Sequence, residues 1–356
     1  MKVLVTRTDR LGDLVLSLPA LRLIKERRPD WSLHVLVAPG SVPLVENEAV
    51  VDRVWTWVPG DTCVRRDLLR AFRREKFEAA LLLQFNHELA TLLKKAHIPR
   101  RHGPLSKFSS WYLLNRGQLQ NRSRCRRHEM QYNLELAARL TGGGPWSGET
   151  EPRLNLAEGQ HELGREFRRE QAAGAEVVAF VHPGSGGSAL DWEPERFAGV
   201  AGSLAALPGF RVFITGSGGD SALIDPMLPL LDSRVEVLLD CYELREFLGV
   251  LTAGDLFIGP STGPLHMAAA LGLAVVGLYP PVRTMAPGRW GPRGGLARAV
   301  VPPVDCPEGR FCRREKCEFF NCLDRVFERD VLDIALALLK QKQEQDAQHK
   351  MRKESE

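Results

Sequence analysis

The segment from Leu256 to Tyr279 constrains the fold of this chain more than any other part of the sequence. It begins with apolar residues, Leu256 to Ile258, passes through a turn rich in glycine and proline, and continues through small residues typical of a closely packed helix. A second apolar run, Ala274 to Tyr279, follows. This order predicts two buried parallel strands joined by a helix that begins near Thr262.

The predicted helix start at Thr262 has two interpretations. Free backbone N–H groups and the positive end of the helix dipole would suit an anionic group such as a diphosphate. A tight turn that only packs a helix on a sheet fits the same residues, because every α/β protein contains several such turns.

Strand-like and helix-like stretches alternate on both sides of a glycine-rich stretch, residues 141–148. The predicted strands are 3–6, 34–38, 79–83, 177–182, 211–215 and 236–239, and the predicted helices include 12–28, 67–75, 195–207 and 244–253. Two parallel sheets with helices on both faces follow from this alternation, and a ligand is expected in a cleft between them, at the carboxyl ends of the strands. The expected parts are a domain at 1–145, a linker and connecting helix at 146–170, a domain at 171–330, and a C-terminal helix and tail at 331–356, which frays after Lys340.

Positive charge is concentrated in one block, although the net charge is only +4. Ten Lys or Arg and no acidic residue lie between Lys94 and Arg127. Such a block attracts phosphates, carboxylates or an anionic membrane surface, and a solvated basic face without a partner is the alternative. The block contains Phe108, Trp111 and Tyr112, which would suit base stacking, but no nucleic-acid-binding motif accompanies them, so nucleic acid is not expected.

The chain has no apolar run of the ~18 residues needed to span a bilayer, and its N-terminus lacks the layout of a signal peptide. We therefore expect a cytoplasmic protein. The P-loop motif GxxxxGK[ST] and the hydrolase motifs GxSxG and HExxH are absent.

Three loops at predicted strand ends carry polar residues suited to chemistry. In residues 7–13, Asp13 either caps its own helix or acts as a general base that takes a proton from a hydroxyl nucleophile. Residues 182–188 and 215–220 offer hydroxyl and backbone N–H groups to phosphate oxygens. The third loop has Ser221 where a dinucleotide fingerprint requires glycine, so it predicts a nucleotide contact without specificity for NAD.

The order of these motifs resembles glycosyltransferase family 9, the heptosyltransferases of lipopolysaccharide core assembly. The resemblance rests on Gly12-Asp13 with Leu18-Pro19, on His182-Pro183-Gly184-Ser185-Gly186 before Trp192, on Gly216, and on Ser261-Thr262-Gly263-Pro264-Leu265-His266. It implies a GT-B fold of two Rossmann-like domains that face a central cleft. It also implies inverting transfer of a heptose from ADP-heptose to an anionic glycolipid at the inner membrane surface, with no metal required for transfer.

The resemblance assigns roles to individual residues. Asp13 matches the general base. The implied donor-binding residues are His182, Pro183, Gly184, Ser185, Gly186, Thr215, Gly216, Ser261, Thr262, Gly263, Pro264 and His266. The implied acceptor-binding residues are Arg7, Arg10, Arg100, Arg101, Lys107, Arg122 and Arg124.

Two positions depart from the family pattern. Ser261 stands where family members commonly have Asp, and Leu190 stands where they tend to have Lys shortly before the tryptophan. The donor could therefore be a nucleotide sugar other than ADP-heptose. The alternative to an enzyme is a non-catalytic protein that binds a nucleotide sugar.

Four cysteines, Cys306, Cys312, Cys317 and Cys322, lie close together near the end of the second domain. Thiolates so grouped in a cytosolic chain favour a structural zinc or iron, with unligated thiols as the alternative, because the spacing is not a standard zinc pattern. A cysteine-ligated iron finger is known in the branch of the family that glycosylates autotransporter proteins. The cysteines therefore support a third interpretation, a heptosyltransferase that acts on a protein acceptor.

Overall fold

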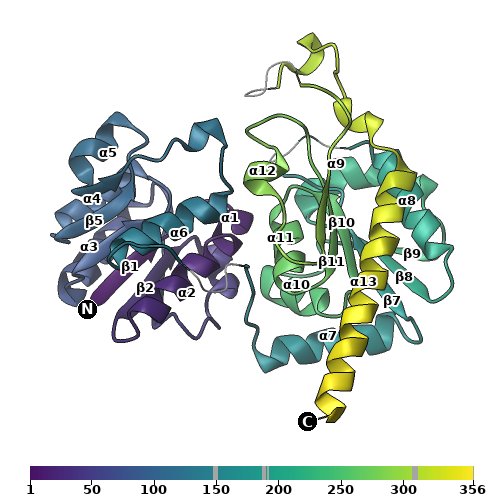
Figure 1. Cartoon of the computed structure of the whole chain (residues 1–356), viewed down its shortest axis with the longest axis horizontal. Helices are drawn as coiled ribbons and strands as arrows, with labels where there is room; N and C mark the ends of the chain where they lie inside the picture. Colours follow the sequence, from purple (N-terminus) through teal and green to yellow (C-terminus); the bar gives the residue numbers. More distant parts are fainter. Residues whose placement is uncertain (147–150, 187–189, 191, 307–311, 356) are drawn as a thin grey trace. The chain divides into compact units, whose positions relative to one another are not determined.

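The computed structural model describes residues 1–146, 151–186, 190, 192–306 and 312–355. The chain forms two compact units, Met1–Asn155 and Leu156–Glu356. Each unit is a six-stranded, fully parallel sheet covered by helices (Figure 1). The predicted α/β class with two parallel sheets is confirmed.

The sheet of the first unit has the strand order β3-β2-β1-β4-β5-β6. Its strands are β1 (Lys2–Thr6), β2 (Ser32–Val37), β3 (Arg53–Thr56), β4 (Ala79–Leu82), β5 (Arg100–Pro104) and β6 (Arg116–Gln118). The central strand β1 is apolar and buried on both faces, as a strand between two helical layers must be. Val5 is in register with Val35 of β2 and with Leu81 of β4.

Helices cover both faces of this sheet. They are α1 (Leu11–Val15), α2 (Leu18–Arg27), α3 (Thr62–Glu75), α4 (His87–Lys95), α5 (Phe108–Leu113) and α6 (Glu129–Leu140). The side chains of α3, α4 and α5 share one apolar core with β1, β2 and β4, and α2 and α6 pack together on the other face. Short 3-10 turns lie at Pro39–Leu44 and Arg122–Arg124.

The single helix predicted for residues 12–28 is wrong, because the chain forms two helices there. Pro19 occupies the first turn of α2 and has no backbone N–H to donate to the preceding turn. The hydroxyl of Ser17 instead donates to the carbonyl of Asp13, at 2.7 Å. The break leaves α1 as a short helix that carries Asp13 in its first turn.

The sheet of the second unit has the order β12-β11-β10-β7-β8-β9. Its strands are β7 (Val177–Val181), β8 (Phe210–Gly216), β9 (Val235–Leu239), β10 (Leu256–Pro260), β11 (Ala274–Leu278) and β12 (Ala297–Val300). Its α-helices are α7 (Glu158–Gln171), α8 (Pro194–Ala205), α9 (Ser221–Ile224), α10 (Leu244–Leu251), α11 (Gly263–Ala270), α12 (Pro287–Trp290) and α13 (Glu328–Ser355). Its 3-10 turns lie at Gly218–Asp220, Asp225–Leu230, Arg314–Lys316 and Cys322–Arg325. The predicted βαβ unit is β10-α11-β11, whose strands pair in parallel.

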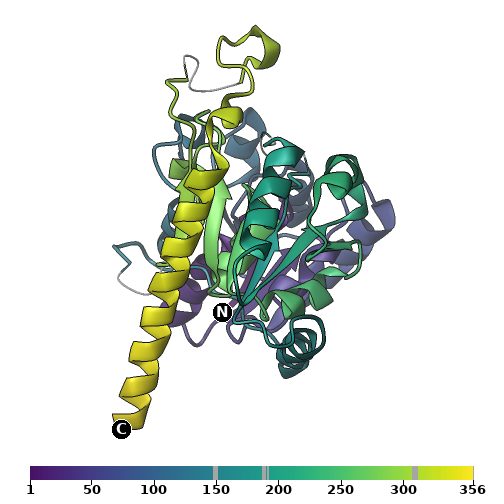
Figure 2. The same ribbon diagram turned by 90° about the vertical axis from the view of Figure 1, so that its right-hand side faces the viewer.

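Helices α8 and α13 cover one face of this sheet, and α7, α10 and α11 lie on the other. Figure 2 shows α13 as one continuous helix, so the predicted fraying after Lys340 is wrong. Lys342 explains part of this continuity, because its ammonium lies 3.0 Å from a carboxylate oxygen of Asp255. Within the described residues, no helix has both the length and the apolar character needed to cross a membrane.

Each sheet has one pair of adjacent strands from which the chain continues toward opposite edges of the sheet. In the first unit this position lies between β1 and β4, and in the second unit it lies between β7 and β10. Open parallel sheets bind ligands outside the carboxyl ends of the strands at such a position. The loops that follow β1, β7 and β10 therefore contain the candidate site residues.

Candidate functional site

Asp13 lies directly beyond β1, at the switch position of the first unit. Helix α1 has Arg10 as its N-cap, and no side chain caps it. The Asp13 carboxylate instead pairs with the guanidinium of Arg7, the residue that follows β1. The side chain of Asp13 is 12% exposed, so the carboxylate is largely shielded from bulk water.

Arg7 is buried and connects Asp13 to a network of polar side chains. Its Nε lies 2.7 Å from a carboxylate oxygen of Asp9, and its Nη1 donates to Glu129 at 3.2 Å and to Asn133 at 3.3 Å. The last two residues lie on α6, far from Arg7 in the sequence. These contacts hold the guanidinium in one orientation toward Asp13.

A second set of contacts fixes the backbone of Asp13. Asn133 donates through its amide nitrogen to the hydroxyl of Ser17, at 3.1 Å, and this hydroxyl donates to the carbonyl of Asp13. Both the carboxylate and the backbone of Asp13 are thus connected to α6. Ser17 and Asn133 were not predicted as site residues, since nothing in their local sequence pattern indicates this network.

The network perturbs the pKa of Asp13. Burial raises the pKa of Asp13 to about 6, the positive charge of Arg7 opposes this rise, and the carboxylates of Asp9 and Glu129 add to it. For Arg7, burial lowers the pKa, but the three neighbouring carboxylates outweigh burial and raise the pKa above its ordinary value. Asp13 is therefore ionised at neutral pH and has the proton affinity that suits a general base.

In the second unit, the loop after β7 packs tightly against its neighbours. The Nδ1 of His182 lies 3.1 Å from the hydroxyl of Thr215, and burial lowers the pKa of His182 to about 4. A Cβ at Gly184 would lie 2.1 Å from a carboxylate oxygen of Asp220, so any larger residue here would displace the Asp220 side chain. Gly186 has a φ of +53°, which glycine adopts without steric cost. The remainder of the predicted loop, residues 187–188, lies outside the described residues.

The start of α11 has polar atoms without partners. Thr262 is the N-cap of this helix but makes no side-chain capping bond. Its hydroxyl oxygen and the Nδ1 of His266 are both buried, and neither has a hydrogen-bond partner among the residues that the structure describes. Burial lowers the pKa of His266 to about 4, so its ring is neutral at neutral pH. Because buried polar groups are normally satisfied, these two atoms mark a place where a polar ligand fits.

Ser261 lies next to Thr262 and bonds to a buried tyrosine. Its side chain shares a hydrogen bond with Tyr279, whose pKa burial raises above its ordinary value. The Tyr279 hydroxyl lies 2.8 Å from the carbonyl of Trp290 in α12. The segment after β11 is thereby connected to the turn before α11. This segment carries Arg283, Arg289 and Arg293, which were not predicted as site residues. Their position after a predicted strand end could have indicated them.

The predicted acceptor-binding cations differ in their surroundings. Arg10, Arg100, Lys107 and Arg124 are exposed, whereas Arg7 is buried. Arg101 donates to the backbone carbonyls of Leu113 and Ile98, and Arg122 donates to Glu129 at 2.6 Å. Arg100 is also engaged, because its Nε donates to the carbonyl of Glu78 at 3.3 Å and its Nη2 lies 3.7 Å from the carboxylate of that residue, at the start of β5 and so at the amino edge of the sheet. Arg10, Lys107 and Arg124 are exposed and accessible to an anion.

Of the four clustered cysteines, Cys322 is buried and the other three are partly exposed. Burial raises the pKa of the Cys322 thiol, and its three neighbours raise it further, which places all four in one electrostatic environment. In the ranges that the structure describes, however, no three His, Cys, Asp or Glu side chains come together as a metal-binding group.

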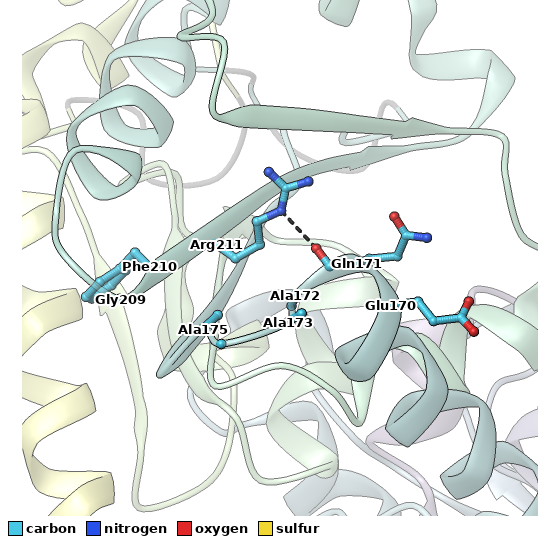
Figure 3. A pocket seen from close by; sticks show the side chains of 9 residues that line it. Glu170, Gln171, Ala172, Ala173, Ala175, Gly209, Phe210 and Arg211 are labelled. Carbon is cyan, nitrogen blue, oxygen red and sulfur yellow. Dashed lines mark hydrogen bonds between the residues drawn. The ribbon is translucent and has the colours of Figure 1, made fainter.

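A surface pocket of about 450 Å³ lies at the opposite edge of the second sheet, between the end of α7 and the start of β8 (Figure 3). Gln171, Ala175 and Phe210 are among its lining residues. The guanidinium of Arg211 in this pocket donates to the carbonyl of Gln171, at 3.0 Å, and also pairs with Glu236. Since its charged group is already engaged and the carboxyl ends of the strands are distant, this pocket is not the candidate site.

Comparison with known proteins was made for sequence and structure. The sequence matches glycosyltransferase family 9 (heptosyltransferase) over residues 65–315. A candidate glycosyltransferase of Haemophilus influenzae is 30% identical over 311 residues, which are 85% of this chain and 90% of that protein. A family 9 glycosyl transferase of Veillonella parvula superposes with a TM-score of 0.84 at 19% identity, covering 96% of this chain and 97% of that one. ADP-heptose lps heptosyltransferase II of E. coli superposes with a TM-score of 0.78 at 22% identity, covering 96% of this chain and 100% of that one.

Proposed function

Because this chain belongs to glycosyltransferase family 9 and has the GT-B fold of its heptosyltransferases, we propose that it transfers a heptose or a related sugar from an ADP-sugar to an anionic, lipopolysaccharide-type acceptor. The observation that carries this proposal is Asp13, a buried carboxylate with a raised pKa at the switch position of the first unit. A relative of the same fold is named for ADP-heptose and lipopolysaccharide, which supports these substrates.

Asp13 would act as the general base. Its carboxylate accepts the proton of an acceptor hydroxyl while that oxygen bonds to the anomeric carbon of the donor. The bond from the anomeric carbon to the diphosphate breaks, ADP leaves with the bonding electron pair, and the anomeric configuration inverts. A pKa of about 6 leaves Asp13 ionised at neutral pH and still basic enough to share the proton in the transition state.

Arg7 would position this base and not bind the acceptor. Its guanidinium is buried and already bonded to Asp9, Asp13 and α6. The orientation of the Asp13 carboxylate is thus fixed before substrate arrives, which lowers the cost of reaching a reactive geometry.

The donor diphosphate would bind at the start of α11. The hydroxyl of Thr262 and the Nδ1 of His266 have no hydrogen-bond partner among the described residues there, and the helix dipole favours negative charge. The loop containing His182, Ser185 and Gly186 would complete the donor site from β7. Family members tend to have a lysine where this chain has Leu190. The arginines that follow β11, Arg283, Arg289 and Arg293, would supply that positive charge instead. Stabilisation of the leaving diphosphate would in this way need no divalent metal.

The exposed cations Arg10, Lys107 and Arg124 would bind the anionic acceptor, at the inner face of the cytoplasmic membrane. Arg100, at the amino edge of the sheet and paired with Glu78, would not. A structural zinc or iron at the four cysteines is a separate proposal, supported by the soft thiolate donors and their shared environment. Such a metal would stabilise the end of the second unit and would have no part in transfer.

Nucleotide binding and ADP release test the function. Thermal shift with ADP, UDP, GDP, CDP and ADP-heptose should show selective stabilisation by ADP and ADP-heptose, and release of ADP should depend on a lipid-free inner-core saccharide. Stronger stabilisation by another nucleotide would contradict the ADP-sugar donor and indicate a sugar linked to that nucleotide. Tight donor binding without ADP release would favour a non-catalytic binder, for which the Ser261 departure is the supporting observation. Release of ADP only with a protein acceptor would favour the protein-modifying alternative.

A further inference from the structure

Helix α5 exposes three large aromatic side chains on one face. Phe108, Trp111 and Tyr112 are 88%, 61% and 53% exposed, and their spacing of three and four residues places them together on the helix. The rings of Phe108 and Tyr112 meet edge to face, with centroids 6.3 Å apart. We call these three residues the α5 aromatic face. Exposed apolar clusters of this kind mark interaction sites.

The opposite face of α5 is anchored in the protein. Ser110 and Leu113 are buried, the hydroxyl of Ser110 donates to the carbonyl of Lys107, and Leu113 joins the core shared with α4. The aromatic face is therefore presented outward by a fixed helix, and the exposure of these rings is not the result of an unpacked terminus.

Positive charge lies beside the α5 aromatic face. The ammonium of Lys94 lies 5.9 Å from the centre of the Tyr112 ring, and Lys107 directly precedes α5. Both lysines are exposed, and among the described residues neither forms an ion pair with a carboxylate. The segment from Lys94 to Arg127 contains no acidic residue that could neutralise them.

The position of α5 relates it to the candidate base. Helix α5 follows β5, and Asp13 follows β1 in the same parallel sheet, so both segments begin at the carboxyl edge of that sheet. The Phe108 end of α5 therefore lies at the edge where, under the proposed function, the acceptor is received, and the helix runs from there toward the opposite edge, where Arg101 at the start of β5 donates to the carbonyl of Leu113.

We propose that the α5 aromatic face, with Lys94 and Lys107 beside it, docks the first unit on an anionic phospholipid surface. Aromatic side chains partition into the interfacial region of a bilayer, and cations bind the headgroups beside them. Each such cation strengthens binding about fivefold, and salt weakens it. The proposal deepens the membrane contact of the proposed function by assigning it to one helix.

Flotation with lipid vesicles tests this assignment on the full chain, with neither donor nor acceptor present. Wild type should bind vesicles that contain phosphatidylglycerol and bind phosphatidylcholine vesicles weakly. The triple variant Phe108→Ser, Trp111→Ser, Tyr112→Ser should lose about tenfold or more in partitioning, and Lys94→Gln with Lys107→Gln about twentyfold or more at low salt. The control Leu228→Ser with Leu230→Ser, which removes two exposed leucines from the second unit, should bind like wild type.

Equal vesicle binding by the aromatic variant and wild type would overturn the proposal. So would a concentration-dependent dimer in sedimentation that the aromatic variant abolishes, because the face would then bind a second copy. Melting of each variant verifies folding, and Trp111→Phe, which keeps an apolar ring, should retain most of the binding. ADP release with a lipid-free saccharide is measured separately, so a failure of docking is distinguished from a failure of the proposed function.

Discussion

Replacing Arg7 by methionine tests whether the buried cation sets the pKa of the candidate base. Methionine has a similar length and no charge, so the three carboxylates around Arg7 would lose their shared partner. A unit charge about 4 Å from a carboxylate contributes roughly 4 kcal/mol at an effective dielectric constant of about 20, which corresponds to roughly three pKa units. The pKa of Asp13, about 6 in the wild type, should therefore rise to roughly 9 in Arg7→Met.

The expected kinetic result follows from the ionised fraction. At neutral pH this fraction would fall from about nine tenths to about one hundredth, so kcat/KM should fall roughly 100-fold and recover as pH rises. The assay is ADP release in the presence of a saccharide acceptor, from about pH 5 to about pH 10. A 100-fold loss of kcat/KM, with its pH profile still showing an apparent pKa near 6 on the acidic side, would refute the reasoning. Arg7 would then act through geometry or stability alone.

A matched variant separates this effect from loss of stability. Arg22 pairs with the buried carboxylate of Glu48 at 2.8 Å, in the same unit and outside the Asp13 network. Arg22→Met should lower the free energy of unfolding by a few kcal/mol, as loss of one partner of a buried pair does, and leave the pH profile unchanged. Should Arg7→Met fail to fold, Arg7→Lys retains the charge without the forked donors and should give a smaller displacement of the limb.

Three further changes test the remaining assignments. Asp13→Asn should reduce transfer by ~10² or more with donor affinity nearly intact. The pKa of Asp13 in the folded protein, about 6, exceeds the ordinary value of 3.8, so the wild-type carboxyl contributes about 3 kcal/mol of stability that is present below about pH 4 and is lost as pH rises toward 6. Urea titrations should show that Asp13→Asn removes this dependence of the free energy of unfolding on pH. Thr262→Val should raise the melting temperature of the ligand-free protein, since its buried hydroxyl has no partner in the described part of the chain, and should weaken ADP binding about tenfold in calorimetry. Thr252→Val, which removes a hydroxyl bonded to the carbonyl of Gly249, should instead cost about 1 kcal/mol and leave ADP affinity unchanged. Metal analysis should find about one zinc or iron per chain and chelation should lower the melting temperature, while metal-free protein with an unchanged melting curve would contradict the cysteine proposal.

The parallel sheets and the position of the site loops could be predicted from the sequence because their signals are local. Apolar runs such as Ala274 to Tyr279 define strands, and the polar residues directly after them must lie at the carboxyl edge. Pro19 was also a local signal, and weighing its missing N–H would have predicted the break between α1 and α2.

The Arg7 network could not be predicted, because its members are distant in the sequence. Glu129 and Asn133 meet Arg7 only after α6 packs on the sheet, and an arginine after a strand is otherwise a natural candidate for contact with an anionic ligand. The continuation of α13 has the same cause, since Lys342 reaches Asp255 only in the folded chain. Burial and partners of charged side chains are tertiary properties, and they decide which of the predicted cations are accessible.

The two units differ in whether their candidate site residues already have hydrogen-bond partners, and this difference fits the role proposed for each unit. In the first unit, Asp13 is fully supported by Arg7 and Ser17 before any substrate is present, which suits a base that must keep one orientation. In the second unit, Thr262 and His266 have polar atoms without partners in the described part of the chain, at the start of α11, which is costly unless a ligand occupies the place. A protein that only needed a stable fold would gain by replacing these two side chains with apolar ones. Their presence at the helix start that follows the switch strand β10 supports the proposal that this turn binds the leaving nucleotide.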